Sequence, residues 1–353
     1  MAEKADFGYI NARIRGMKSR LLDKGALESL ILLPDTASVM EALEKTVYGP
    51  EIHEAKSLCS GIVCIDTALR KNFARSFRKI LHFVKGTNAE ELIAIFLQRW
   101  DIQNIKTILR GKKMHVPNEE ILGCLVSAGE LDDVTLAEAI RQPDVRAVID
   151  LLATWDIRYA VPLTAAYPEF QEAGDLVILE IALDRFAYRE TLGALSGKSY
   201  NVQLVRDVIR TEIDITNLKT IFRFLRDGTD LEEAKSFFID GGKEFDRKAL
   251  ESLYRRETTE AVFTALKGTP YDILQRVPEK SLRAGKISAI EKEFDRLLIA
   301  KGMHAFFGDP LSIAPVIGYF WAKSNEITNL RIITHMKVAD IPEENLREEL
   351  CYV

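Results

Sequence analysis

Residues 101–110 read DIQNIKTILR, and two later stretches repeat the pattern: DITNLKTIFR at 214–223 and EITNLRIITH at 326–335. The first two stretches share seven of ten residues. In all three, apolar residues recur at intervals of three and four positions, which is typical of an amphipathic helix. The chain therefore encodes one helix three times, and this repetition is the strongest fold signal in the sequence.

The repeat extends far beyond this helix. GALESLILLPD at 25–35 aligns with VTLAEAIRQPD at 134–144 and KALESLYRRET at 248–258. Pro34 and Pro143 are each followed by Asp, which marks a turn between two helices. We therefore predict an N-terminal helix and three diverged repeat units, with the boundaries 1–22, 23–131, 132–245 and 246–353.

Each repeat unit spans about 110 residues, whereas solenoid repeats span roughly 20–50. Each unit is therefore expected to be a small multi-helix domain, and the scarcity of glycine (20) and proline (11) favours an all-α fold. A closed arrangement leaves no unit with an unpartnered face, whereas a linear array needs dissimilar capping units. We therefore expect the three homologous units to surround a pseudo-threefold axis.

Composition and motifs argue against several classes of function. Apolar residues make up 47% and charged residues 29%, and the net charge of −5 gives no bulk electrostatic case for nucleic-acid binding. No signal-peptide pattern opens the chain, and the apolar run at 310–322 is too short to span a membrane. The four cysteines lack the spacing of a disulfide framework, which indicates a reducing cytosol. The five histidines are scattered and no zinc or nucleophile motif occurs, so we expect no metal, cofactor or catalytic site.

Each repeated helix carries an acid and an amide, one turn apart, inside its apolar stripe. These residues are Asp101 with Asn104, Asp214 with Asn217, and Glu326 with Asn329. Buried polar groups are costly unless they are hydrogen-bonded. Two interpretations follow: each pair staples neighbouring helices within its own unit, or the three pairs face the central axis and meet a partner inserted there. A catalytic use of the carboxylates has no other support in the sequence.

The stretch GALSGKS at 193–199 is close to a phosphate-binding loop, G-x-x-x-x-G-K-[ST]. It has three residues between the glycines where that loop needs four to bring successive backbone amides around the phosphates. The preceding segment looks apolar like a strand, but its counterparts in the other repeats are helical in pattern. We therefore interpret GALSGKS as a turn between two helices.

Three features occur together in this chain: the opening YINARIRGMKSRLL (9–22), the three repeated helices, and the ending IPEENLREELCYV (341–353). In this combination the chain resembles the C subunit of archaeal A-type and bacterial V-type rotary ATPases, to which the d subunit of the eukaryotic V-ATPase is similar. The resemblance covers nearly the whole chain.

The resemblance implies an all-helical funnel of three similar domains with a central cavity, at the cytoplasmic face of the membrane. It implies a non-catalytic part of the central stalk that couples a rotating shaft, built from the D and F subunits, to the membrane proteolipid ring, for ion transport or ATP synthesis. Contact with the membrane would be peripheral. A rigid adapter with two large interfaces resolves the mismatch between a shaft of few helices and a ring of many identical subunits.

On this interpretation, the six acid and amide residues of the repeated helices are candidates for the shaft interface. A second candidate surface is the basic amphipathic helix RKNFARSFRKILHFVK at 70–85. Its basic face is either an ordinary solvated surface or a surface that faces lipid headgroups and the polar loops of the ring. The residues concerned are Arg70, Lys71, Arg75, Arg78 and Lys79.

Two functions of other classes remain open. The chain could be a nucleotide-binding enzyme that uses Gly197, Lys198 and Ser199, or a helical scaffold with unrelated partners.

Overall fold

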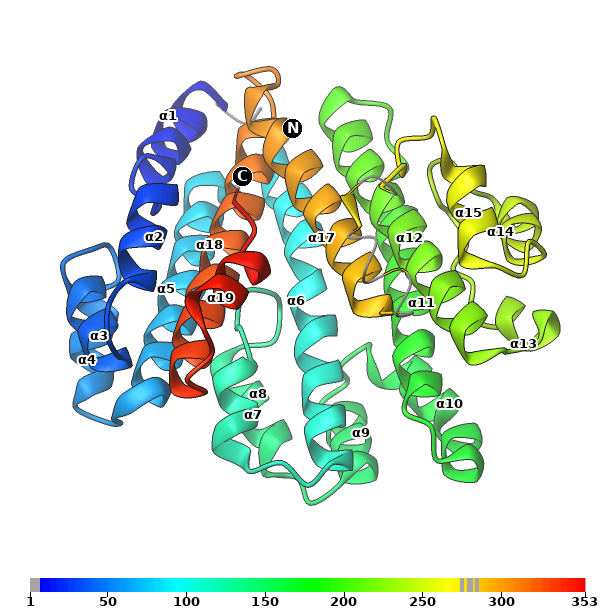
Figure 1. Cartoon of the computed structure of the whole chain (residues 1–353), viewed down its shortest axis with the longest axis horizontal. Coiled ribbons are helices and arrows are strands. Elements are labelled where there is room, and N and C mark those ends of the chain that lie inside the picture. Colours follow the sequence, from blue (N-terminus) through cyan, green and yellow to red (C-terminus); the bar gives the residue numbers. More distant parts are fainter. Residues whose placement is uncertain (1–6, 274–275, 278–281, 283–285, 353) are drawn as a thin grey trace. The chain divides into compact units, whose positions relative to one another are not determined.

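The computed structural model describes residues 7–273, 276–277, 282 and 286–352. The regular structure of these residues consists of helices without strands (Figure 1), which confirms the all-α prediction. None of the described helices is both long enough and apolar enough to cross a membrane.

The chain folds into two compact units. The first unit contains residues 1–180 and 305–353, and the second contains residues 181–304. The second unit is therefore inserted into the sequence of the first. This division differs from the three repeat units of the sequence, whose boundaries stay a prediction.

The first unit is built around three long helices, α5, α6 and α18. Its elements are α1 (Phe7–Lys18), α2 (Lys24–Ile31), α3 (Thr36–Glu44), α4 (Gly49–Lys56), α5 (Gly61–Val84), α6 (Asn88–Lys113), α7 (Asn118–Cys124), α8 (Asp133–Arg141), α9 (Val145–Thr154), α10 (Ala160–Ala173), the start of α11 (Val177–Ala194), η2 (Ala305–Phe307), α18 (Ala314–Val338) and α19 (Glu343–Glu349). Aromatic rings join the long helices: the Phe320 ring lies 4.4 Å from that of Phe96 and 5.1 Å from that of Phe77. Such edge-to-face contacts add to the stabilisation from apolar burial.

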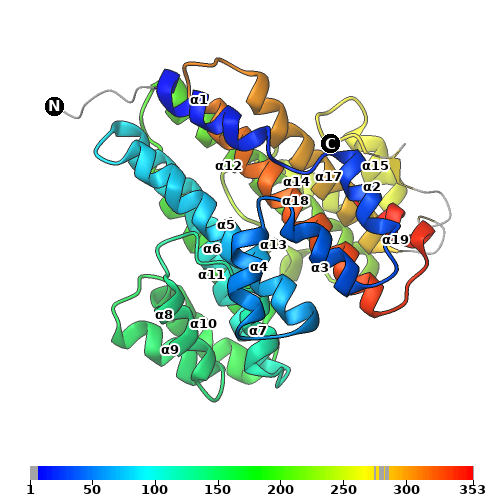
Figure 2. The same ribbon diagram turned by 90° about the vertical axis from the view of Figure 1, so that its left-hand side faces the viewer.

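The C-terminal helix of the first unit packs against the N-terminal helices. Helix α18 contacts α1, α2, α3 and α5, and Figure 2 shows these elements together although nearly 300 residues of sequence can separate them. The two ends of the chain therefore complete one packed body.

The second unit is built around α12 (Tyr200–Asp227) and α17 (Ile287–His304). Its other elements are the remainder of α11, α13 (Leu231–Lys235), α14 (Arg247–Tyr254) and α15 (Thr259–Leu266). Phe222 of α12 is fully buried, and its ring lies 4.8 Å from that of Phe263 and 5.9 Å from that of Phe294. The unit therefore has an apolar core of its own.

An aspartate begins the first helix of each sequence repeat. Asp23, Asp132 and Asp246 are the N-cap residues of α2, α8 and α14, and each carboxylate accepts a hydrogen bond from a backbone N–H three residues later. An N-cap satisfies a donor that the helix itself cannot pair and stabilises it by about 1 kcal/mol. Asp35 and Asp144, which follow the two prolines, cap α3 and α9 in the same way, so the predicted helix–helix turns are confirmed.

Candidate functional site

The six acid and amide residues of the repeated helices are all buried, with 3% or less of each residue exposed. They lie near the middle of α6, α12 and α18, the three long helices that carry the repeated sequence. Their hydrogen bonds go to other parts of this chain. We call each pair, with the segment that it holds, a joint; the first joint lies on α6, the second on α12 and the third on α18.

In the first joint, Asp101 accepts two backbone hydrogen bonds, from Glu130 N (2.8 Å) and Leu131 N (3.0 Å). Asn104 exchanges two hydrogen bonds with Val126: the amide nitrogen donates to the carbonyl oxygen (2.7 Å), and the amide oxygen accepts from the backbone N–H (2.9 Å). The Tyr159 hydroxyl lies 3.5 Å from the carboxylate. The segment that precedes α8 is therefore fastened to α6.

The second joint has the same design. Asp214 accepts from Lys243 N (2.9 Å), Glu244 N (2.8 Å) and Phe245 N (3.3 Å), and from the Tyr271 hydroxyl (2.7 Å). Asn217 exchanges two hydrogen bonds of 2.8 Å with the backbone of Ile239. The segment that precedes α14 is therefore fastened to α12.

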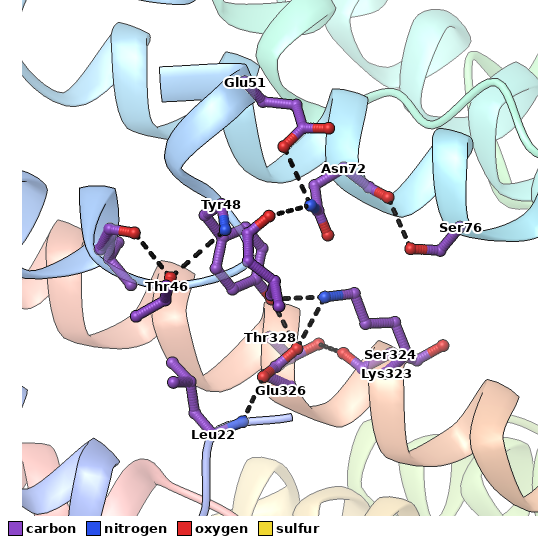
Figure 3. Close-up of polar contacts among 12 residues, drawn as sticks. Leu22, Thr46, Tyr48, Glu51, Asn72, Ser76, Lys323, Ser324, Glu326 and Thr328 are labelled. Atoms are coloured by element: carbon purple, nitrogen blue, oxygen red, sulfur yellow. Dashed lines mark hydrogen bonds and ion pairs between the residues drawn. The ribbon is translucent and has the colours of Figure 1, made fainter. Parts of the chain in front are cut away.

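The third joint uses both ends of the chain. Asn329 exchanges hydrogen bonds of 2.9 and 3.0 Å with the backbone of Cys351. One Glu326 oxygen accepts from Leu22 N (2.6 Å), and the other accepts from the Tyr48 hydroxyl (2.5 Å), as Figure 3 shows. In each joint the amide binds a residue 22 positions later in the sequence. The acid has two partners: the segment just before an N-cap aspartate, and a tyrosine that comes after that aspartate in the sequence.

The third joint differs from the others in one respect: it contains a buried ion pair. Lys323 donates to the Glu326 carboxylate (2.8 Å) and to the Tyr48 hydroxyl (2.8 Å), and only 1% of Lys323 is exposed. Burial lowers the pKa of the Lys323 ammonium, although the Glu326 charge acts in the opposite direction. In the first and second joints, two and three backbone N–H groups donate to the acid. In the third joint one backbone N–H donates to Glu326, and the Lys323 ammonium takes the place of the others.

A glycine lies directly against the acid in the first two joints. A Cβ added to Gly129 would lie 2.3 Å from the Asp101 carboxylate, and one added to Gly242 would lie 2.1 Å from the Asp214 carboxylate. Only a residue without a side chain lets the backbone approach this closely. The glycines are therefore part of the joints.

Replacing Gly242 by Ala should lower the free energy of unfolding by about 3 kcal/mol, because neither neighbour of the new methyl group can move freely. The added Cβ would meet the Asp214 carboxylate and, at 2.7 Å, the Phe245 carbonyl oxygen. Urea titration measures the change. Gly193→Ala is the control, since its Cβ would meet open space, and we expect it to be neutral or stabilising by up to about 1 kcal/mol. Equal effects of the two substitutions would contradict this account of the glycine.

Burial also changes the acidity of the two aspartates. It raises the pKa of Asp101 to about 6, although the Leu131 and Glu130 N–H groups favour the charged form. It raises the pKa of Asp214 as well, against the effect of the Glu244 N–H and the Tyr271 hydroxyl. Asp101 and Asp214 therefore carry their charge at a cost in free energy.

Asp101 should make stability depend on pH in mild acid. Its pKa in the folded chain lies above its ordinary value of 3.8, so the folded chain holds this proton more firmly than the unfolded chain does. The resulting stabilisation is full below the unfolded pKa and is lost as pH rises through about 6. From about pH 7 to about pH 5, the free energy of unfolding should therefore gain about 1 kcal/mol from this group.

The measurement is urea titration of the native chain and of Asp101→Asn at both pH values. The variant lacks the titrating group, so its unfolding free energy should gain about 1 kcal/mol less on acidification. The same pH dependence in both proteins would show that Asp101 is ionised equally in the folded and unfolded chains.

The basic candidates of α5 are mostly paired within the chain. Four of the five form ion pairs: Arg70 with Asp133 (2.8 Å), Lys71 with Glu54 (2.6 Å), Arg75 with Glu51 (2.8 Å) and Arg78 with Asp133 (3.9 Å). The fifth, Lys79, has its ammonium 5.9 Å from the centre of the Phe83 ring. Phe73, Phe77, Ile80 and Val84 of this helix are buried in the core, as the sequence pattern predicts, whereas Leu81 is only partly buried.

The residues of the GALSGKS stretch connect α11 to α12, so the predicted turn between two helices is confirmed. Ser199 is the N-cap of α12 and accepts from Val202 N (3.4 Å). The Gly197 carbonyl accepts from the Arg206 guanidinium (2.9 Å). Among the residues that the structure describes, no group of three His, Cys, Asp or Glu side chains could hold a metal ion.

Sequence reasoning missed the three tyrosines and the lysine of the joints. The repeat register could have revealed the tyrosines, because Tyr48, Tyr159 and Tyr271 each follow their N-cap aspartate at a similar distance. No comparable signal marks Lys323, since neither of the other repeats has a basic residue at its position.

The joints recur at the positions where the sequence repeats, and they extend from Leu22 to Cys351. The family model of the ATP synthase (C/AC39) subunit matches residues 10–349, which is the same span almost in full. The chain belongs to this family.

Relatives in the ATP synthase (C/AC39) subunit family match from end to end. The C subunit of the A-type ATP synthase of Halorubrum lacusprofundi is 32% identical over 344 residues, which cover 97% of this chain and 96% of that protein. The proteins of the same name from Methanococcoides burtonii and Haloferax volcanii are 30% and 29% identical, over 98% and 97% of this chain and 94% and 96% of their own lengths. The resemblance noted in the sequence is therefore confirmed at the level of the family.

Proposed function

We propose that this chain is the non-catalytic central-stalk adapter of a rotary A/V-type ATPase. It would couple the rotating shaft, made of the D and F subunits, to the membrane proteolipid ring, and so serve ion transport or ATP synthesis. The observation that carries this proposal is family membership over residues 10–349, with relatives that are named as C subunits of A-type ATP synthases. Its place would be peripheral, at the cytoplasmic face of the membrane.

The joints support a mechanical role. Each joint holds a long helix of 25 to 28 residues to another part of the chain by at least four hydrogen bonds. At the third joint, three of these bonds involve Leu22 and Cys351, which lie near the two ends of the chain. Buried polar networks whose members are all satisfied rigidify the structure around them. A protein that transmits torque needs such fixed helices. We propose that the three repeats form a funnel about a pseudo-threefold axis, with the shaft tip in its central cavity.

The six acid and amide residues would act on the shaft interface through the segments that they hold. Their own side chains are 3% exposed or less and are hydrogen-bonded within the chain. A partner would therefore meet the surfaces of the held segments, 126–131 and 239–245, rather than the carboxylates. Loss of a joint would weaken shaft binding because the segment is no longer in place.

The basic residues of α5 would face the ring or the membrane. Arg75 and Arg78 are exposed, with 68% and 64% of their side chains accessible. Their acidic neighbours Glu51 and Asp133 offset part of the positive charge that they offer to a partner. Any contribution to ring binding should therefore be modest and sensitive to salt.

The experiment that tests the proposal is co-purification. An affinity-tagged copy of the chain, expressed in its own host and extracted in mild detergent, should bring down the shaft proteins and the proteolipid together. Recovery of the chain alone, or with proteins unrelated to a rotary ATPase, would overturn the proposal and favour a helical scaffold with other partners.

A further inference from the structure

One end of the first unit carries basic and aromatic side chains in alternation. They come from α1, from the last turns of α5 and from η2, which are neighbours in the fold; α1 lies above α5 in Figure 2. We call this surface the cation–aromatic strip. Its members are Tyr9, Arg13, Arg15, Lys18, Lys79, Phe83, Lys85, Phe306, Phe307 and Leu311.

On the α5 side, cations lie against the Phe83 ring. The Arg13 guanidinium is 5.1 Å from the centre of that ring and 5.6 Å from the centre of the Tyr9 ring. The Lys79 ammonium is 5.9 Å from the Phe83 ring. Each cation is thus held by an aromatic face, which attracts positive charge without neutralising it.

On the other side of α1, the same arrangement involves η2. The Lys18 ammonium is 3.9 Å from the centre of the Phe306 ring and 5.2 Å from that of Phe307, and the Arg15 guanidinium is 5.8 Å from that of Phe306. The buried Asn11 side chain ties α1 to the residues after η2, because it donates to the carbonyls of Pro310 (2.7 Å) and Ser312 (2.9 Å). Helix α1 therefore carries cations that contact aromatic rings of both α5 and η2.

The strip is positively charged in a chain whose net charge is −5. Within the described part of the chain, its five cations form no ion pair with a carboxylate, unlike the basic residues farther back on α5. Helix α1 and residues 67–89 contain no Asp or Glu. Two acids follow strip residues closely in sequence, and both accept backbone hydrogen bonds: Asp309 from Leu311 N (2.9 Å) and Glu90 from Gly86 N (2.7 Å).

Large apolar side chains project beside these cations. Phe307 is 75% exposed, Leu311 is 67% exposed and Tyr9 is 54% exposed. Exposed aromatic and aliphatic side chains next to unneutralised Lys and Arg are the composition of surfaces that lie in a lipid headgroup region. Positive charge then meets the phosphates, and the rings enter the boundary between headgroups and acyl chains.

We propose that the cation–aromatic strip binds the anionic phospholipid headgroups of the membrane surface directly. The remainder of this acidic chain is repelled by an anionic membrane, so the strip also selects which end of the first unit approaches it. The inference goes beyond the proposed coupling function, because it requires neither the shaft nor the ring. The isolated chain should therefore show the contact, whatever happens in co-purification.

The experiment is co-sedimentation of the purified full chain with vesicles at low ionic strength. Vesicles of equal parts phosphatidylglycerol and phosphatidylcholine should bind the chain, pure phosphatidylcholine vesicles should bind it far less, and added salt should release it. Arg13→Gln, Arg15→Gln and Lys79→Gln together should lower the partition coefficient roughly hundredfold, at about fivefold for each charge.

The matched control removes three exposed lysines elsewhere: Lys45→Gln, Lys248→Gln and Lys267→Gln. It alters the net charge equally and should bind the anionic vesicles nearly as well as the native chain, because these lysines lie outside the strip. A circular dichroism melt of both variants verifies that they are folded. Phe307→Ser with Leu311→Ser should weaken binding to the anionic vesicles at low ionic strength, although it leaves the net charge unchanged. The proposal is overturned if the native chain ignores anionic vesicles, or if control and strip variants lose binding equally.

Discussion

Replacing Lys323 by Met should lower the free energy of unfolding of the first unit by about 3–5 kcal/mol, the largest effect expected of any single substitution considered for this chain. The substitution keeps the apolar length of the side chain and removes its charge. Glu326 would then remain buried without its cation, and its remaining partners among the described residues would be Leu22 N and the Tyr48 hydroxyl. Removing one partner of a buried pair is costly because an uncompensated charge is left in a medium of low polarity.

The double variant Lys323→Met with Glu326→Leu distinguishes the cost of leaving one charge unpaired from the cost of replacing the two side chains. Because both charges are gone, it should recover part of the loss, and urea titration of the native chain, of the two single variants Lys323→Met and Glu326→Leu, and of the double variant gives the coupling energy. Lys248→Met is the control for the loss of an exposed lysine and should change stability by less than about 0.5 kcal/mol. A single Lys323→Met variant as stable as the native chain would contradict the role assigned to the buried contact between Lys323 and Glu326.

Replacing Asn217 by Leu should cost about 3–4 kcal/mol, because two buried backbone groups of Ile239 lose their partners together. The leucine is close to asparagine in size, so the loss measures hydrogen bonding more than cavity formation. Gln203→Leu, an exposed amide on the same helix with one hydrogen bond to the Lys198 carbonyl, should cost less than about 1 kcal/mol. The comparison is made by urea titration.

The equivalent substitution Asn104→Leu should behave in the same way, because Asn104 makes the same two hydrogen bonds with Val126. A stable, fully folded Asn217→Leu protein would contradict the role of the joints. It would favour instead the interpretation in which these amides are kept for direct contact with a partner.

The repeated sequence was sufficient to predict the fold class and the burial of the acid–amide pairs. An acid at position 101 or 214 inside an apolar stripe has to be hydrogen-bonded, because an unpaired buried carboxylate is too costly. The helix–helix turns at Pro34 and Pro143 could be predicted as well, since turn formation is decided by residues close together in sequence. These predictions rest on local physics.

The partners of each pair could not be predicted in the same way. Asp101 binds a segment 30 residues away, and Glu326 binds Leu22 across nearly the whole chain. Which distant backbone meets a buried carboxylate depends on how the helices pack, and helical periodicity carries no information about that. The division into two compact units, with residues 181–304 inserted in the first, is likewise a property of packing.

The joints explain why the repeats have kept a polar pair in an apolar setting. A leucine at each position would pack well, but it would leave the N–H groups of the following segment unpaired. The acid and amide are thus the means by which one helix fixes the start of the next repeat. At the third joint, Leu22 N–H and the Lys323 ammonium donate to the acid, where N–H groups of a following loop donate in the first two joints.

The most direct test of the proposed coupling role is reconstitution from purified parts. The D and F proteins of the shaft are mixed with the proteolipid ring in detergent, with and without this chain, and complexes are separated by size-exclusion chromatography. We expect shaft and ring to elute together only when the chain is present. The Asn217→Leu variant should yield less of that complex, in proportion to the fraction of the chain that is unfolded or in which residues 239–245 are displaced. Elution of shaft and ring together without the chain, or separately in its presence, would contradict the account.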